Sequence, residues 1–185
     1  MSSQNSRQVP TFAEHRDAVA AAVVEVSENS FFAFVAPAEP DLFSELVNIP
    51  SASEGDASGE GRWLRTSVSF DGAFNGVVEV AMPERLAREL LASFVGLGPD
   101  DPVEQEELVD STGEFVNQVC GTWLTRACHH RRFDLTPPAV ERMPVGWAPV
   151  VDEGSAGERG WVYFTLNDQP VSVGVRFAPF GESAT

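Results

Sequence analysis

Apolar residues near the start of the chain repeat at helical spacing and predict a first helix over residues 12–29. Thr11 and Glu14 have the three-residue spacing of a capping box, directly after Pro10, and mark where this helix begins. The apolar face of the helix contains Ala18, Val19, Ala22, Val23 and Val26. The next segment, residues 31–43, is compatible with a strand or with the end of this helix, and its pattern leaves both open.

Alternating apolar and polar residues then predict a β-hairpin with strands at residues 63–70 and 74–82. Asp71 and Gly72 lie between these strands, and this dipeptide favours a tight turn with positive φ angles. One face of the second strand carries Phe74, Gly76, Val78, Val80 and Met82.

Two helices follow the hairpin. The first begins at Pro83, whose fixed φ suits the first helical position, and ends at Gly96 and Gly98. Its apolar stripe contains Leu86, Leu90, Leu91 and Phe94. The second of these helices is longer and spans residues 104–129.

The residue pattern in the last part of the chain predicts three strands. Residues 136–143 form a strand entered through prolines, which is typical of a sheet edge or a strand start. Residues 144–160 contain glycine and proline and predict a loop. Residues 161–166 and 171–177 alternate in polarity around residues 167–170, and predict a second hairpin.

The order of these elements predicts an α+β fold, in which an antiparallel-rich sheet of hairpins has helices packed on one face. A chain of 185 residues suits one domain, which we place at residues 10–180. Residues 1–9 are polar and predict a disordered tail. Residues 50–62 are rich in glycine, serine and acid, and predict a flexible loop within the domain.

The charge of the chain limits its partners. It contains 12 Lys and Arg against 28 Asp and Glu, for a formal net charge of −16. Binding to nucleic-acid phosphates or to anionic membranes needs clustered positive charge, so we expect neither partner. No apolar run approaches the length of a membrane span, and the first residues lack the apolar region of a signal peptide, so we expect a cytoplasmic protein.

The helix at residues 104–129 carries the candidate chemistry. One side of it is apolar and predicts a core-facing surface, formed by Leu108, Phe115, Val116, Val119, Trp123 and Ala127. Asp110, Glu114 and Asn117 share the opposite side, where the simplest interpretation is a solvated face. Gly121 follows one turn later, although glycine in a helix interior costs about 1 kcal/mol relative to alanine. Either a partner approaches Asn117 closely over Gly121, or another element of this chain packs there.

The pattern Asp110-x3-Glu114-x2-Asn117 followed by Gly121, with Pro138 and Val140 downstream, resembles the active-site helix of the CheC, CheX and FliY phosphatases of bacterial chemotaxis. The order of elements over residues 12–178 also follows this family, so the resemblance implies a CheC/CheX-like fold. The first helix has no second Glu-x2-Asn motif. The chain is therefore similar to the single-site CheX type.

This resemblance implies a phosphatase that hydrolyses the aspartyl phosphate of a phosphorylated CheY-type response-regulator receiver domain, in chemotaxis or other two-component signalling. It assigns Asn117 to orienting the attacking water and Glu114 to bonding a lysine of the receiver, with Asp110, Gly121 and Pro138 as supporting motif residues. Mg²⁺ is expected in the receiver's active site, and no cofactor in this chain. The CheX type also implies a homodimer. The alternative is a non-catalytic receiver-binding or adaptor module on the same fold.

Other constellations predict no chemistry. His129 and His130 point about 100° apart on a helix, and their spacing from Cys128 and Glu114 matches no common metal site, so we expect none. Cys120 faces the core side and is expected to be a small buried hydrophobe. Cys120 and Cys128 would lie about 12 Å apart along one helix, too far for a disulfide. Trp147 and Trp161 suit an interface or a satellite core.

Overall fold

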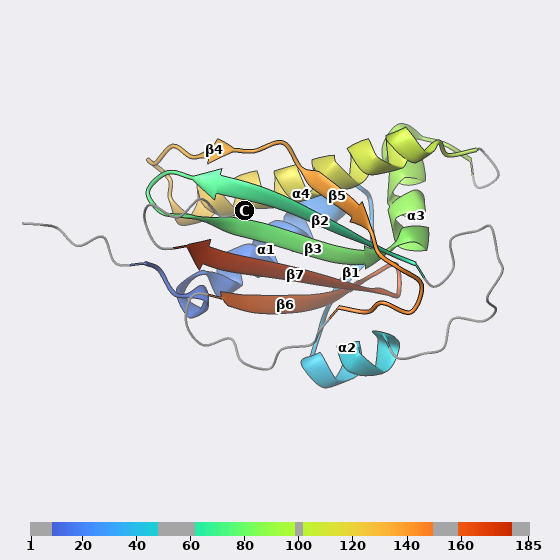
Figure 1. The fold of residues 1–185 in the computed structure, drawn as a ribbon, viewed down its shortest axis with the longest axis horizontal. Coiled ribbons are helices and arrows are strands. Elements are labelled where there is room, and N and C mark those ends of the chain that lie inside the picture. The colour runs from blue at the N-terminus through green and yellow to red at the C-terminus, as the bar shows by residue number, and fades with distance from the viewer. Residues whose placement is uncertain (1–8, 48–61, 99–101, 150–158, 179–185) are drawn as a thin grey trace, which may run out of the picture.

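The computed structural model describes residues 9–47, 62–98, 102–149 and 159–178, which form an α+β fold around one antiparallel sheet (Figure 1). The strands are β1 (Val35–Ala38), β2 (Trp63–Asp71), β3 (Asn75–Pro83), β4 (Asp134–Leu135), β5 (Ala139–Arg142), β6 (Arg159–Leu166) and β7 (Gln169–Ala178). The helices are α1 (Phe12–Asn29), α2 (Pro40–Val47), α3 (Glu84–Val95) and α4 (Gln105–Ala127). The seven strands run in the order β1-β6-β7-β3-β2-β4, with β5 also pairing with β2. The predicted fold class is confirmed.

Two predicted segments fall almost wholly outside the described residues. The disordered tail was expected at residues 1–9 and the flexible loop at residues 50–62, and the structure describes only residue 9 and residue 62 of these two segments. None of the helices in the described ranges combines the length and apolarity that crossing a bilayer requires.

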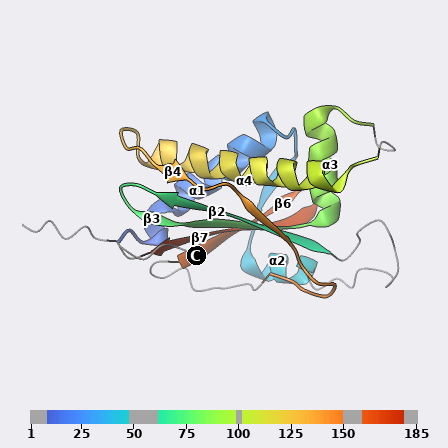
Figure 2. The same ribbon diagram turned by 45° about the horizontal axis from the view of Figure 1, so that its top comes forward.

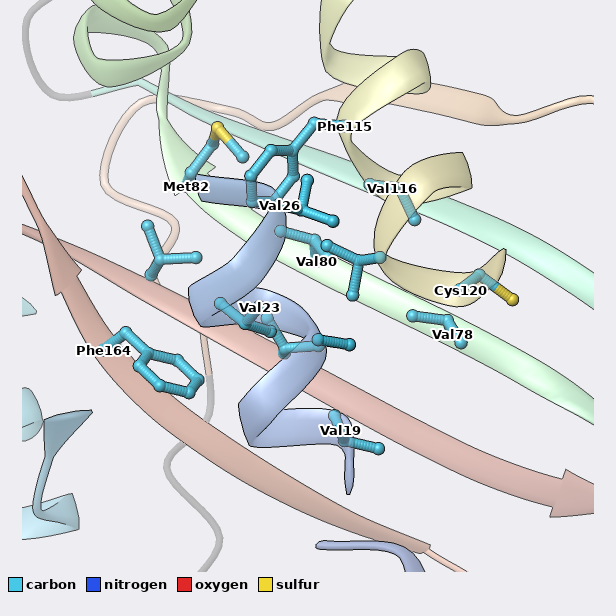
Figure 3. Close-up of a cluster of buried hydrophobic side chains, with 14 of the residues drawn as sticks. Val19, Val23, Val26, Val78, Val80, Met82, Phe115, Val116, Cys120 and Phe164 are labelled. Atoms are coloured by element: carbon cyan, nitrogen blue, oxygen red, sulfur yellow. The ribbon is translucent and has the colours of Figure 1, made fainter. Parts of the chain in front are cut away.

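The main core lies between one face of the sheet and helices α1, α3 and α4, as predicted. Figure 2 shows α1 and α4 on one side of the sheet and α2 on the other. Alternate strand residues and the apolar helix faces meet in a contiguous buried cluster (Figure 3). Its labelled members are Val19, Val23, Val26, Val78, Val80, Met82, Phe115, Val116, Cys120 and Phe164. This packing fixes α4 on the sheet through its apolar side.

The first and third helices start and stop close to where sequence signals place them. The backbone N–H of Thr11 donates to the Glu14 carboxylate at 2.8 Å, which confirms the predicted capping box. Pro83 is the residue before α3 rather than its first helical residue, a shift of one position. Gly96 ends α3 in the left-handed conformation at φ +74°, as its position predicts.

Residues 31–43 form a strand followed by a short helix that the sequence analysis does not predict. Helix α2 packs on the sheet face opposite α4, where the fully buried Phe43 ring lies 4.6 Å from the ring of Tyr163. Trp63 and Trp161 join this smaller cluster, and Trp147 packs against it. The tryptophans of the loop and of β6 therefore belong to a satellite core.

The two hairpins turn by different means. Gly72 does not adopt the positive φ expected of it; a Cβ there would lie 2.5 Å from the carbonyl oxygen of Arg132 and 2.6 Å from the Phe133 ring. Glycine is needed for this close approach, so the predicted turn conformation is wrong although the hairpin is correct. Asn167 and Asp168 supply the positive φ angles, +48° and +62°, in the two-residue turn between β6 and β7.

The strand predicted at residues 136–143 is shorter, β5 at residues 139–142, and two prolines separate it from β4, which lies before the predicted start. Ser67 pairs with Ala139 and Phe70 pairs with Leu135, so two residues of β2 face three residues, 136–138. This is a one-residue β-bulge on an edge strand, where proline's missing N–H is tolerated. The predicted edge position is confirmed. The bulge places Pro138 against α4, with consequences for the site.

A buried carboxylate connects three elements at one end of the sheet. Glu84, the first residue of α3, is fully buried and accepts hydrogen bonds from Arg88 at 2.8 Å and from Arg142 of β5 at 2.7 Å. Arg142 also donates to Gln105, the first residue of α4, at 2.7 Å. Burial raises the pKa of Glu84, but the hydrogen bonds and charges of Arg142 and Arg88 outweigh burial and hold it below the ordinary value.

We expect Glu84→Gln to lower the free energy of unfolding by about 2–3 kcal/mol at pH 7, because it leaves two arginines without their counter-charge. Both arginines are partly exposed to solvent, so the loss should not exceed the smallest losses observed when one partner of a fully buried ion pair is removed. A lowered carboxylate pKa stabilises the fold above the unfolded pKa, and that stabilisation disappears as pH falls through the folded pKa. Urea unfolding should therefore show the difference from wild type at pH 6–8, shrinking below about pH 4. A difference that is constant down to pH 3 would contradict this ionic role.

Candidate functional site

Helix α4 provides a rigid support for the candidate residues. Its N-terminus is closed by a capping box in which the backbone N–H of Glu104 donates to the Glu107 carboxylate at 3.2 Å. The predicted core side is buried at Leu108, Phe115, Val116, Val119 and Trp123, and partly buried at Ala127. The opposite side is therefore fixed outward by packing.

The four helix residues singled out by spacing lie on this outward side. Asp110 and Glu114 are exposed, whereas Asn117 and Gly121 are half-buried at the surface of the helix. We call the line Asp110, Glu114, Asn117 and Gly121 the polar stripe. Glu114 and Asn117 are three positions apart, so their side chains are neighbours on it.

Gln118 is a contributor to this surface that the sequence analysis missed. Its side-chain amide donates to Oε1 of Glu114 at 2.8 Å, one helical turn along α4. The i, i+4 spacing from Glu114 was the available signal. This bond restrains the exposed Glu114 carboxylate through one oxygen, and its second oxygen has no hydrogen bond among the described residues.

Gly121 is not required by packing within the described chain. A Cβ built at Gly121 meets no heavy atom within 4 Å. The alternative in which another element packs tightly there is therefore wrong for the part of the chain that the structure describes. What glycine provides at this position is a low helix surface one turn from Asn117, open to an approaching molecule.

Gly113 behaves in the opposite way and explains the position of Pro138. A Cβ at Gly113 would lie 2.8 Å from Cγ of Pro138, so the bulge before β5 packs directly on α4 beside Glu114. Pro138 is not part of the polar stripe. It contacts the helix backbone that carries the stripe.

Two hollows flank the C-terminal part of the polar stripe. The larger, about 460 Å³, lies between α1 and α4 and is lined by Glu25, Val26, Asn29, Ser30, Gln118, Gly121, Thr122, Thr125 and Arg126. The smaller, about 120 Å³, is lined by Gly121, Leu124, Thr125, Arg131, Phe133 and Leu135. Because Gly121 and Thr125 line both, they form a low ridge that a partner surface can straddle.

The remaining reactive side chains are placed as inert groups. Burial raises the pKa of the Cys120 thiol to about 12, so it stays protonated and lies in the core as expected. Cys120 and Cys128 are both free, and His129 and His130 are exposed beyond the end of α4. The described ranges contain no cluster of three or more His, Cys, Asp or Glu able to hold a metal ion.

The model of the family described as "Chemotaxis phosphatase CheX" matches residues 65–143, which run from β2 through β5 and include the whole polar stripe. No curated protein matches the sequence.

Solved structures share the fold at low sequence identity. A CheX from Desulfovibrio desulfuricans is 15% identical with a TM-score of 0.63, covering 89% of this chain and 99% of that one. CheX from Vibrio vulnificus is 18% identical with a TM-score of 0.60, covering 95% and 100%. The CheX of a CheX–CheY–BeF3–Mg complex from Borrelia burgdorferi is 16% identical with a TM-score of 0.51, covering 93% and 100%. The resemblance to the CheX, CheC and FliY chemotaxis proteins and the CheX-like fold are thereby confirmed.

The two glycines of α4 should respond oppositely to substitution by alanine. We expect Gly121→Ala to raise the free energy of unfolding by up to about 1 kcal/mol, because the site is open and alanine favours helix. Gly113→Ala should lower it by about 1–3 kcal/mol, because the new methyl group overlaps the rigid Pro138 ring. Urea unfolding of the two variants measures both effects. Equal destabilisation would show that Gly121 is also packed.

Proposed function

We propose that this protein is a phosphatase that hydrolyses the aspartyl phosphate on a CheY-type receiver domain. The observation that carries the proposal is the outward-facing pair Glu114 and Asn117, on a helix fixed from behind, beside a glycine that nothing in the described chain requires. These residues lie within the segment that the CheX family model matches. The complex of Borrelia burgdorferi CheX with CheY supports a receiver as the partner.

The chemistry required of α4 is positioning. Hydrolysis of an acyl phosphate passes through a loose transition state, in which water forms a bond to phosphorus as the bond to the aspartyl oxygen breaks. The Asn117 amide can accept one hydrogen bond and donate another, so it can hold a water in line without adding charge beside the phosphoryl group. The products are inorganic phosphate and the free aspartate of the receiver.

Glu114 serves docking in this proposal. Its carboxylate accepts a hydrogen bond from a lysine of the receiver, and the bond from Gln118 holds it in the required orientation. Mg²⁺ belongs to the receiver's own active site, where it neutralises the phosphoryl oxygens, so this chain needs no cofactor of its own. A homodimer and a cytoplasmic location remain part of the proposal.

Asn117→Ala should abolish most of the acceleration of receiver dephosphorylation, by about 100-fold, because the water loses its positioning group. Decay of a radiolabelled phosphoreceiver, measured across CheY-type receivers from the same genome, provides the test. Binding of the variant to the activated receiver should remain. If the wild-type protein binds a receiver but leaves its decay unchanged, the phosphatase fails and the adaptor alternative stands.

Glu114→Gln should raise KM for the phosphoreceiver by about 10-fold, since the charge opposite the partner's lysine is lost, while kcat changes less. The matched control is Glu45→Gln, an exposed acid of α2 on the other side of the sheet, which should leave both constants unchanged. A lower kcat with an unaltered KM would instead assign Glu114 to the chemical step.

A further inference from the structure

Charge is distributed unevenly along the polar stripe. Its N-terminal half is acidic, since Asp110 and Glu114 are exposed, and Glu106 and Glu107 add exposed carboxylates in the first turn of α4. Beyond its C-terminal end the chain carries Arg131 and Arg132, both exposed. Among the described residues neither forms an ion pair, whereas Arg126 is already paired with Glu25 across the larger hollow.

The segment that carries these two arginines is held firmly. The backbone N–H of Arg131 donates to the carbonyl oxygen of Cys128 at 2.9 Å, which reverses the chain after α4. The centroid of the Phe133 ring then lies 5.0 Å from that of Phe74, and the carbonyl oxygen of Arg132 and the Phe133 ring fit closely over Gly72. The arginines are therefore presented from an anchored segment and not from a free loop.

This segment also lies beside the polar stripe. Arg131 and Leu135 form one wall of the smaller hollow, and Gly121 and Thr125 form the other. Gly121 is one helical turn, about 6 Å, from Asn117. A cation in this segment also complements the C-terminal dipole of α4, since the charge of Arg131 acts on the C-cap residue Cys128.

We propose that Arg131 and Arg132 form a basic rim that recognises the carboxylates surrounding the phosphoryl group of the receiver. The inference rests on the proposed function. A site that holds Mg²⁺ and an aspartyl phosphate is rich in carboxylates, and arginine binds carboxylates in a bidentate manner. The net charge of −16 repels such a partner, but within a Debye length of about 8–10 Å the nearest charges dominate.

The rim also sets the direction of docking. Glu114 attracts the positive part of the receiver's site and Arg131 attracts its negative part, with Asn117 between them. The two ends of the stripe therefore differ in sign, and a receiver docked in the reverse direction places like charges together. Only one orientation brings the phosphoryl group to Asn117 with both charges matched.

The test measures kcat and KM for dephosphorylation by Arg131→Gln and by Arg131→Glu combined with Arg132→Glu. At low salt, about 0.05 M, KM should rise about 3- to 10-fold for the first variant and further for the second, with kcat unchanged. The difference should shrink to less than about 2-fold at 0.5 M salt. Arg131→Lys should recover only part of the affinity, because lysine keeps the charge but cannot form the bidentate pair. Arg176→Gln is the matched control, because Arg176 is exposed on the sheet face away from α4.

Unchanged KM and salt dependence in both rim variants, with wild-type activity present, would overturn the rim and leave the phosphatase intact. A fall in kcat alone, or an equal effect of Arg176→Gln, would also overturn it. Calorimetric binding of a beryllofluoride-activated receiver separates the rim proposal from the phosphatase proposal. If the wild-type protein binds this receiver without catalysing its dephosphorylation, the phosphatase proposal fails. The rim proposal still stands in that case if Arg131→Gln weakens binding. A thermal unfolding midpoint (Tm) equal to that of the wild-type protein shows that each variant keeps the fold.

Discussion

The buried carboxylate of Glu84 holds together the end of the molecule on which the site depends. It lies at the start of α3, it binds Arg142 of β5, and Arg142 in turn binds the first residue of α4. A buried charge is tolerable only when hydrogen bonds and opposite charge surround it, so these elements must meet in one arrangement. Strand β5 and helix α4 are thereby fixed relative to each other.

The fixed position of β5 also restrains the centre of α4, through the bulge before β5. Pro138 rests on Gly113, next to Glu114, and the apolar side of the helix is buried from Leu108 to Trp123. The helix is therefore restrained on its core side and on one flank, and exposed along the polar stripe. Preorganisation of this kind suits the task proposed for Asn117, to hold one water in line, since a displaced side chain loses most of the benefit.

Much of this fold follows from local sequence signals. Both hairpins, the three long helices and the outward direction of the polar stripe were predictable, because each depends on apolar periodicity within one element. Helix α2 was not, since eight residues give too little periodicity and its burial depends on the distant Tyr163. The role of Gly72 was misjudged for the same reason: its constraint comes from Arg132 and Phe133, 60 residues further along the chain.

The two glycines of α4 show where sequence reasoning reaches its limit at the site. Gly113 and Gly121 look equivalent in the sequence, but within the described ranges another element packs against Gly113 and none packs against Gly121. The distinction is tertiary, and it converts an ambiguous helix glycine into an open surface. The i, i+4 spacing of Gln118 from Glu114 is common on helices, and only the hydrogen bond between the two side chains gives it significance.

The low ridge at Gly121 and its two hollows also separate what keeps this protein folded from what it recognises. The side chains at its edges, such as Thr125 and Arg131, are exposed and take no part in the core, whereas the helix beneath is held by residues on the opposite side. Substitutions along these edges can therefore accumulate with little effect on stability. A lineage could redirect the same scaffold from one partner to another while Asn117, the amide of the proposed site, stays in place.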